Sequence, residues 1–204
     1  WKHIWLSEGF ATYAEVLYLE HTNGHDAYKQ SIDEKMGTDQ GLYAGSIIAK
    51  SDTAFWDAFA PRVYNKGAIV LHMLRGITGD SMFLAIMKNY LNNPKLRYGN
   101  AKTEDFIAEC ERVYGKSLTW FFDEWVYART ESIDRPGYEY TWKAIPVSPS
   151  AYRVNVDIKQ TTASTLLYRM PVTITITSQK SNTTYIVVDS LAVQSFTFPA
   201  ANKP

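Results

Sequence analysis

The spacing of apolar residues changes near Pro136-Gly137, and this change limits the possible folds of the 204-residue chain. Before that point apolar residues recur every three or four positions, which is the spacing of one helix face. After it they alternate with polar residues, most clearly in Val172–Thr177, as in half-buried strands. We therefore predict an α+β fold, with a helical domain over residues 1–135 and an antiparallel β-sandwich domain over residues 136–204.

The helical part shows several amphipathic segments separated by short polar or glycine-containing breaks. The predicted helices are Leu6–Tyr18, a segment resuming at Asp26, Val63–Leu74 ending at Gly76 or Gly79, Ser81–Asn92, Glu104–Tyr114 and Leu118–Ala128. Asp80, Thr103 and Ser117 are the expected N-caps of the last three, because short polar side chains accept hydrogen bonds from free helix N–H groups. Gly115 is the expected left-handed terminator.

The second part contains four runs with strand character. They are Tyr152–Ile158, Val172–Thr177, Tyr185–Val188 and Phe196–Phe198. We interpret the tail, residues 199–204, as a loop. The β-sandwich is therefore expected to be incomplete within this sequence.

Composition excludes several classes of protein. Lys+Arg and Asp+Glu both number 21, so the formal net charge of +0 argues against nucleic acid as the main partner. No apolar run is long enough to span a membrane. The single cysteine, Cys110, cannot form an intrachain disulfide. The compartment, whether cytoplasmic or secreted (including periplasmic), and the oligomeric state stay open.

One motif near the start points to metal chemistry. Trp5–Ala11 reads W-L-S-E-G-F-A, and it resembles the segment of M1 zinc aminopeptidases, in the gluzincin clan, that supplies the third zinc ligand. The resemblance implies that Glu8 is that ligand, beside two histidines and a general base from an upstream H-E-x-x-H helix. The alternative for Glu8 is a helix-start carboxylate stabilised by the helix dipole.

Two further positions match the same family. Glu15 lies two turns after Glu8 on the same helix face, and the resemblance implies that it orients a metal ligand; a surface carboxylate or ion pair is an equal alternative. Tyr64–Gly67 resembles the family's Y-x-K-G motif, which implies that the Tyr64 hydroxyl stabilises the oxyanion. For Lys66 we expect a carboxylate partner, and for Gly67 close packing.

The resemblance continues through the helices from Gly79 to Arg129 and more weakly into the β region. It implies a thermolysin-like catalytic domain, peptide substrates, Zn²⁺ and hydrolysis of N-terminal peptide bonds through a metal-bound water. Neither H-E-x-x-H nor the family's substrate-binding G-x-M-x-N occurs in this sequence. We therefore expect these 204 residues alone to be inactive and to bind zinc weakly.

Two other interpretations are considered. The chain could be a non-catalytic M1-like scaffold or interaction module, or a helical-plus-β binding module unrelated to the family. The pair His21 and His25 has the i, i+4 spacing of H-E-x-x-H, but Asn23-Gly24 breaks the helix between the two rings. His3 and His72 are interpreted as structural.

Overall fold

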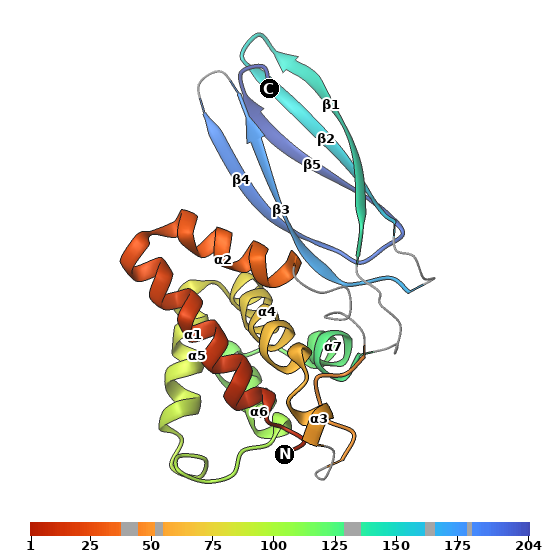
Figure 1. The fold of residues 1–204 in the computed structure, drawn as a ribbon. Helices are drawn as coiled ribbons and strands as arrows, with labels where there is room; N and C mark the ends of the chain where they lie inside the picture. Colours follow the sequence, from red (N-terminus) through yellow and green to blue (C-terminus); the bar gives the residue numbers. More distant parts are fainter. Residues whose placement is uncertain (38–44, 52–54, 129–135, 162–165, 179–180) are drawn as a thin grey trace. The chain divides into compact units, whose positions relative to one another are not determined.

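A computed structural model describes residues 1–37, 45–51, 55–128, 136–161, 166–178 and 181–204. The chain forms two compact units, Trp1–Ile133 and Asp134–Pro204. Helices make up the first and antiparallel strands the second, as Figure 1 shows, so the α+β prediction is confirmed. The boundary predicted after residue 135 abuts residues 129–135, which lie outside the described residues.

The helical unit contains α1 to α7 and a terminal π-helix, η2. Their bounds are α1 Trp5–Asn23, α2 His25–Gly37, α3 Phe55–Ala58, α4 Pro61–Thr78, α5 Asp80–Asn92, α6 Thr103–Tyr114, α7 Thr119–Phe122 and η2 Asp123–Ala128. Gly115 ends α6 with φ 74° and ψ 12°, so the predicted left-handed terminator is confirmed. The π-helical turn in the last predicted helix was not anticipated.

An aromatic cluster forms the core between α1, α5, α6 and α7. Phe106 lies at its centre, with ring centroids 5.0 Å from Tyr90, 5.1 Å from Phe10 and 6.0 Å from both Trp5 and Phe122. All four contacts are edge-to-face, which aromatic rings prefer over a face-to-face sandwich. This cluster fixes the start of α1, where Trp5 is fully buried.

None of the three predicted caps is the N-cap residue of its helix, and for two of them a tertiary partner takes the side chain. Asp80 lies inside α5, and its carboxylate accepts a hydrogen bond from Arg75 Nε at 2.7 Å. Thr103 Oγ1 accepts the indole N–H of Trp5 at 2.9 Å instead of capping α6, and Lys102 is the N-cap residue. Ser117 Oγ accepts the Thr119 N–H at 3.3 Å, but the N-cap residue of α7 is Leu118, one position later than predicted.

The second unit is a two-layered sandwich. Its strands are β1 Tyr138–Ser148, β2 Ala151–Gln160, β3 Met170–Thr177, β4 Asn182–Asp189 and β5 Val193–Ala201. One sheet has the order β1-β2-β5 and the other is the β3-β4 hairpin, with all pairs antiparallel. The core between the layers comprises Val154, Val156, Ile158, Ile176 and Phe198.

β1 and the last residues of β5 differ from what the sequence pattern predicts. Residues 199–201 are not a loop but the end of β5, where Arg153 of β2 lies opposite Pro199. Proline is tolerated there because β5 is an edge strand and its outer side needs no ladder donor. In the described part of the chain, no helix is long and apolar enough to cross a membrane.

Candidate functional site

The two motif segments meet where α1 crosses α4. A Cβ atom added to Gly9 would lie 2.9 Å from the Gly67 Cα and 3.3 Å from the Val63 carbonyl oxygen. Only glycine at both positions allows this approach, because a Cβ does not come within 3.0 Å of backbone atoms. Glu8 precedes Gly9, and Tyr64 lies one turn before Gly67, so both site candidates are carried by the crossing segments.

Each candidate lies in the first turn of its helix. Glu8 is half-buried, its N–H donates to the Ile4 carbonyl at 3.0 Å, and its own carbonyl accepts the Thr12 hydroxyl at 2.7 Å. Tyr64 is also half-buried, three residues after Pro61 begins α4. A carboxylate at a helix N-terminus is favoured by the helix dipole whether or not it ligates a metal.

Lys66 anchors the segment before α4. It is 2% exposed, and its ammonium group donates to the Gly45 carbonyl oxygen at 2.6 Å rather than to the expected carboxylate. Burial, helped by the charge of Arg62, lowers the pKa of Lys66 to about 8. Arg62 Nε donates to the Ser46 carbonyl at 3.0 Å. Two cations of α4 therefore hold residues 45 and 46 through backbone oxygens.

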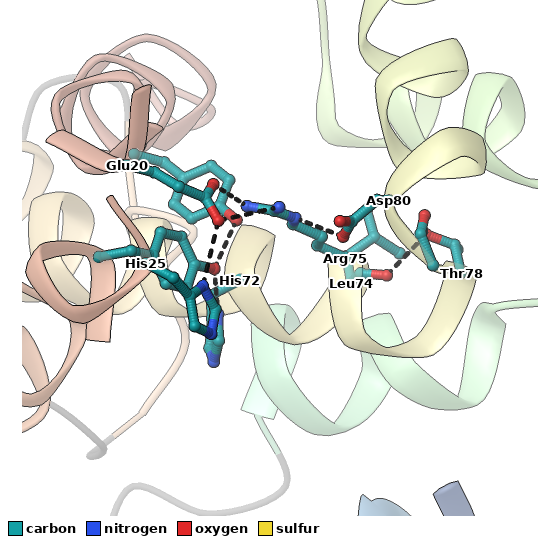
Figure 2. Close-up of polar contacts among 10 residues, drawn as sticks. Glu20, His25, His72, Leu74, Arg75, Thr78 and Asp80 are labelled. Carbon is teal, nitrogen blue, oxygen red and sulfur yellow. Dashed lines mark hydrogen bonds and ion pairs between the residues drawn. The ribbon is translucent and has the colours of Figure 1, made fainter. Parts of the chain in front are cut away.

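An ion network joins the C-terminal ends of α1 and α4 to the start of α5, as Figure 2 shows. Arg75 of α4 donates to both Glu20 carboxylate oxygens, at 2.6 and 3.3 Å, and to Asp80 at 2.7 Å. The Arg75 hydrogen bonds lower the pKa of Glu20 and of Asp80, and side-chain hydrogen bonds, first that to Asp80, raise the pKa of Arg75. His25 lies 3.3 Å from Glu20.

A buried hydroxyl relay lies beside this network. The Tyr13 and Tyr28 hydroxyls are 3.0 Å apart, and the Tyr28 hydroxyl lies 2.6 Å from His72 Nδ1. The Arg75 guanidinium sits 5.1 Å from the Tyr28 ring centroid. Burial is the main cause that raises the pKa of both tyrosines and lowers that of His72. Sequence reasoning missed Tyr28 and Arg75, because nothing local in the chain indicates contacts between helices.

The other candidates occupy different surroundings. Glu15 has a side chain 73% exposed and lies 3.9 Å from Lys35 of α2. His25 stacks on Tyr28 with ring centroids 5.6 Å apart. His3 Nδ1 lies 3.2 Å from the Thr103 N–H at the start of α6 and accepts its hydrogen bond. His3 and His25 thus both have partners within the protein. The role predicted for Glu15, orienting a metal ligand, stays a hypothesis.

The donor set for a metal ion is restricted. Among the described residues, no group of three or more His, Cys, Asp or Glu side chains could hold a metal ion. Glu8 fits one position of a three-ligand zinc site, and the described residues do not offer the other two.

The family to which this chain belongs is shown by its match to a protein-family model. The model of the peptidase family M1 domain matches residues 1–125, well over half of the chain. The chain belongs to peptidase family M1. The matched part of this M1 chain contains the Trp5–Ala11 segment and Tyr64–Gly67.

Curated relatives of this M1 chain are aminopeptidases. It is 28% identical over 148 residues to Probable aminopeptidase 1 of Saccharolobus solfataricus, which covers 68% of this chain and 17% of the relative. It is 33% identical over 111 residues to human Endoplasmic reticulum aminopeptidase 2, covering 52% of this chain and 11% of the relative. This M1 chain therefore spans less than a fifth of the length of these relatives.

A solved structure shares the fold over the whole chain. Legionella pneumophila aminopeptidase A in complex with aspartic acid aligns with a TM-score of 0.73 at 17% identity, covering 100% of this chain and 22% of that one. At this identity the likeness shows the fold alone. It establishes that the helical unit followed by an antiparallel β unit is an arrangement found in an aminopeptidase.

Proposed function

We propose that the full-length protein is a zinc-dependent aminopeptidase and that this chain contributes Glu8 and Tyr64 to its active site. The observation that carries the proposal is the Gly9–Gly67 contact, because it packs the two M1 motif segments backbone to backbone. Membership of family M1 and the aminopeptidase relatives support the reaction class. Peptides are the proposed substrates.

The proposed roles follow from the chemistry of the two side chains. Glu8 would hold zinc through its carboxylate, and zinc, when bound, activates water and polarises a carbonyl. Tyr64 would donate a hydrogen bond to the scissile carbonyl oxygen as negative charge builds on it. Glu15, two turns from Glu8 on α1, would orient the ligand set from outside it.

We propose that the 204 residues alone have no appreciable peptidase activity and no tight zinc site. One carboxylate with water does not compete for zinc as a three-ligand set does. Elemental analysis and hydrolysis of an amino-acid anilide, both on this chain, measure the two properties. Stoichiometric zinc together with hydrolysis would contradict the proposal.

The test of the site uses the full-length protein. Removal of one oxyanion donor costs roughly 10²–10³ in kcat, so Tyr64→Phe should lose activity on this scale with zinc content unchanged. Glu8→Gln should lose bound zinc. The control is Tyr18→Phe, an exposed tyrosine on α1. If both site variants retain wild-type turnover and zinc, Glu8 and Tyr64 do not belong to the active site. If the wild-type full-length protein itself shows no turnover and binds no zinc, the alternative of a non-catalytic M1-like scaffold gains support.

A further inference from the structure

A largely buried, irregular segment lies against the start of α4. Residues 45–49, called the strap below, have neither helical nor strand structure. Gly45, Ile47 and Ala49 are buried, the last two at 0% and 3% exposure. Buried backbone groups outside a helix or sheet need other hydrogen-bond partners. The partners of the strap therefore indicate which parts of the helical unit it holds.

The strap is bonded to α4 on both sides of Tyr64 in the sequence. The Lys66 ammonium group donates to the Gly45 carbonyl oxygen at 2.6 Å, and Arg62 Nε donates to the Ser46 carbonyl oxygen at 3.0 Å. Residues four apart share a helix face, so Arg62 and Lys66 bind the strap with one face of α4. Tyr64, two residues from each, belongs to the opposite face. The two bonds therefore restrain the rotation of the turn that carries Tyr64.

The strap is also bonded to the residues before α1. The Ala49 N–H donates to the Lys2 carbonyl oxygen at 3.1 Å, three residues before α1 begins, and Glu8 lies in the first turn of α1. The Ile47 N–H donates to the Val126 carbonyl oxygen of η2 at 3.0 Å. One short segment thus links the helix starts that carry the two site candidates, and η2 anchors it.

The strap adds a second attachment to the crossing of Gly9 and Gly67. A single close contact fixes the distance between two helices, but each helix can still turn about that contact. The bonds at Lys2 and Arg62 lie outside the crossing. Two attachments fix orientation as well as distance, and a reacting group needs both.

The burial of the Lys66 charge is costly for the fold. Lys66 is 2% exposed, and among the described residues its ammonium group has no carboxylate partner. Burial first, and the charge of Arg62 second, lower its pKa to about 8. A buried cation without a counter-ion is destabilising, and a methionine of similar length would avoid this cost. What the charged side chain provides is the bond to the Gly45 carbonyl oxygen.

We propose that Lys66 and Arg62 are positioning residues, which hold the first turn of α4 on the strap so that the Tyr64 hydroxyl reaches the scissile carbonyl oxygen. The inference rests on the proposed function, because both cations act through Tyr64. Neither contacts the substrate. A displacement of about 1 Å can cost roughly 10²-fold in rate, so the bonds to the strap contribute a measurable part of kcat.

The first test is Lys66→Met in the full-length protein, which removes the donor to Gly45 and keeps the length of the side chain. We expect kcat to fall by about 10- to 100-fold, with KM within about two-fold of wild type and zinc content unchanged, because only the transition-state contact of Tyr64 is affected. Lys29→Met, at an exposed position of α2, is the control and keeps wild-type kcat. A wild-type kcat in Lys66→Met overturns the inference.

A double-mutant cycle separates positioning from general damage to the fold. If Lys66 acts through Tyr64, Lys66→Met lowers kcat by less than about two-fold in the Tyr64→Phe background. An effect on the fold or on another group would give the same loss in both backgrounds, and that result overturns the inference alone. Wild-type turnover of Tyr64→Phe, or a full-length protein without turnover, overturns the proposed function and the inference together.

Arg62 supplies a second variant that keeps the test open if Lys66→Met does not fold. Arg62→Met should lower kcat by about three- to ten-fold, less than Lys66→Met, because the Lys66 bond stays in place. The loss should again disappear in the Tyr64→Phe background. Arg62→Lys keeps a donor near the Ser46 carbonyl and should restore most of the wild-type kcat. Equal losses in Arg62→Lys and Arg62→Met, or no loss in either, overturn the role of Arg62.

Discussion

Gly9 of α1 and Gly67 of α4 are in backbone contact, and neither position has room for a Cβ atom. Each glycine belongs to a different M1 motif segment, the first following Glu8 and the second following Tyr64 by three residues. The requirement for glycine is thus mutual. The two motifs lie more than fifty residues apart in the sequence. They meet because each has a glycine, which has no side chain, at the helix crossing.

Substitution of either glycine by alanine should destabilise the helical unit. Overpacking a close backbone contact costs roughly 1–3 kcal/mol, because the helices must move apart. The measurement is urea unfolding of the 204-residue chain. Gly76→Ala is the control: Gly76 lies in the same α4, has no heavy atom within 4 Å of an added Cβ, and should gain about 0.5–1 kcal/mol. Equal stability of Gly67→Ala and Gly76→Ala would contradict the close contact.

Removal of the Arg75 guanidinium should weaken the junction of α1, α4 and α5. Arg75→Gln should cost roughly 1.5–3 kcal/mol of unfolding free energy, the range for hydrogen bonds to charged groups, since the Arg75 side chain is only 16% exposed. Lys159→Gln breaks a pair in which both side chains are more than half exposed and should cost less than about 0.5 kcal/mol. A similar small cost for Arg75→Gln would show that the network contributes little.

The same network predicts an acid dependence. Arg75 lowers the folded-state pKa of Glu20 and Asp80 below their ordinary values of 4.5 and 3.8. A lowered carboxyl pKa stabilises the fold above the unfolded pKa, and this stabilisation is lost as the pH falls through the folded pKa. The stability difference between wild type and Arg75→Gln should therefore shrink below about pH 4.5. Urea unfolding curves of both proteins, recorded at about every pH unit between about pH 3 and 7, measure this difference in unfolding free energy. A difference that does not change with pH would contradict the ion pairing.

His72 should make the helical unit less stable in mild acid. Its folded pKa lies below the ordinary 6.5, through burial first and the Arg75 charge second, while Asp33 opposes the shift. The unfolded chain binds the proton first, so unfolding free energy falls as the pH drops from 6.5 towards the folded pKa. His72→Gln should remove this part of the slope and keep an acceptor for Tyr28. His21→Gln, at an exposed position, should leave the slope unchanged.

Lys66 should make the stability of the helical unit depend on pH in the alkaline range. Its pKa is lowered to about 8 from 10.5, so between these values the unfolded chain binds more protons than the folded one. Stability contributed by this site therefore rises with pH above about 8. Lys66→Met should lose that rise, measured as the difference from wild type between about pH 7 and 9.5. The control is Lys29→Met at an exposed position; a rise that survives in Lys66→Met would place its origin elsewhere.

Much of the fold follows from local pattern. The spacing of three and four that includes Leu6 and Phe10 placed α1, and the alternation in Val172–Thr177 placed β3. These patterns predict reliably because one face of each element must be buried. β1 escaped detection, and its inner residues Tyr140 and Trp142 are indeed not buried.

The sequence by itself determined the α+β class, the M1 resemblance and the candidates Glu8 and Tyr64, because each rests on residues adjacent in the chain. Only the tertiary structure decided which partners the polar side chains take. Asp80 accepts a hydrogen bond from Arg75 instead of capping α5, and Thr103 accepts one from Trp5 instead of capping α6. The physical reason is that a side chain can bond either the free N–H groups of its helix or a group that packing brings close. Local sequence does not determine which groups packing brings close. The Gly9–Gly67 contact has the same origin: two helices had to cross before either glycine had a structural meaning.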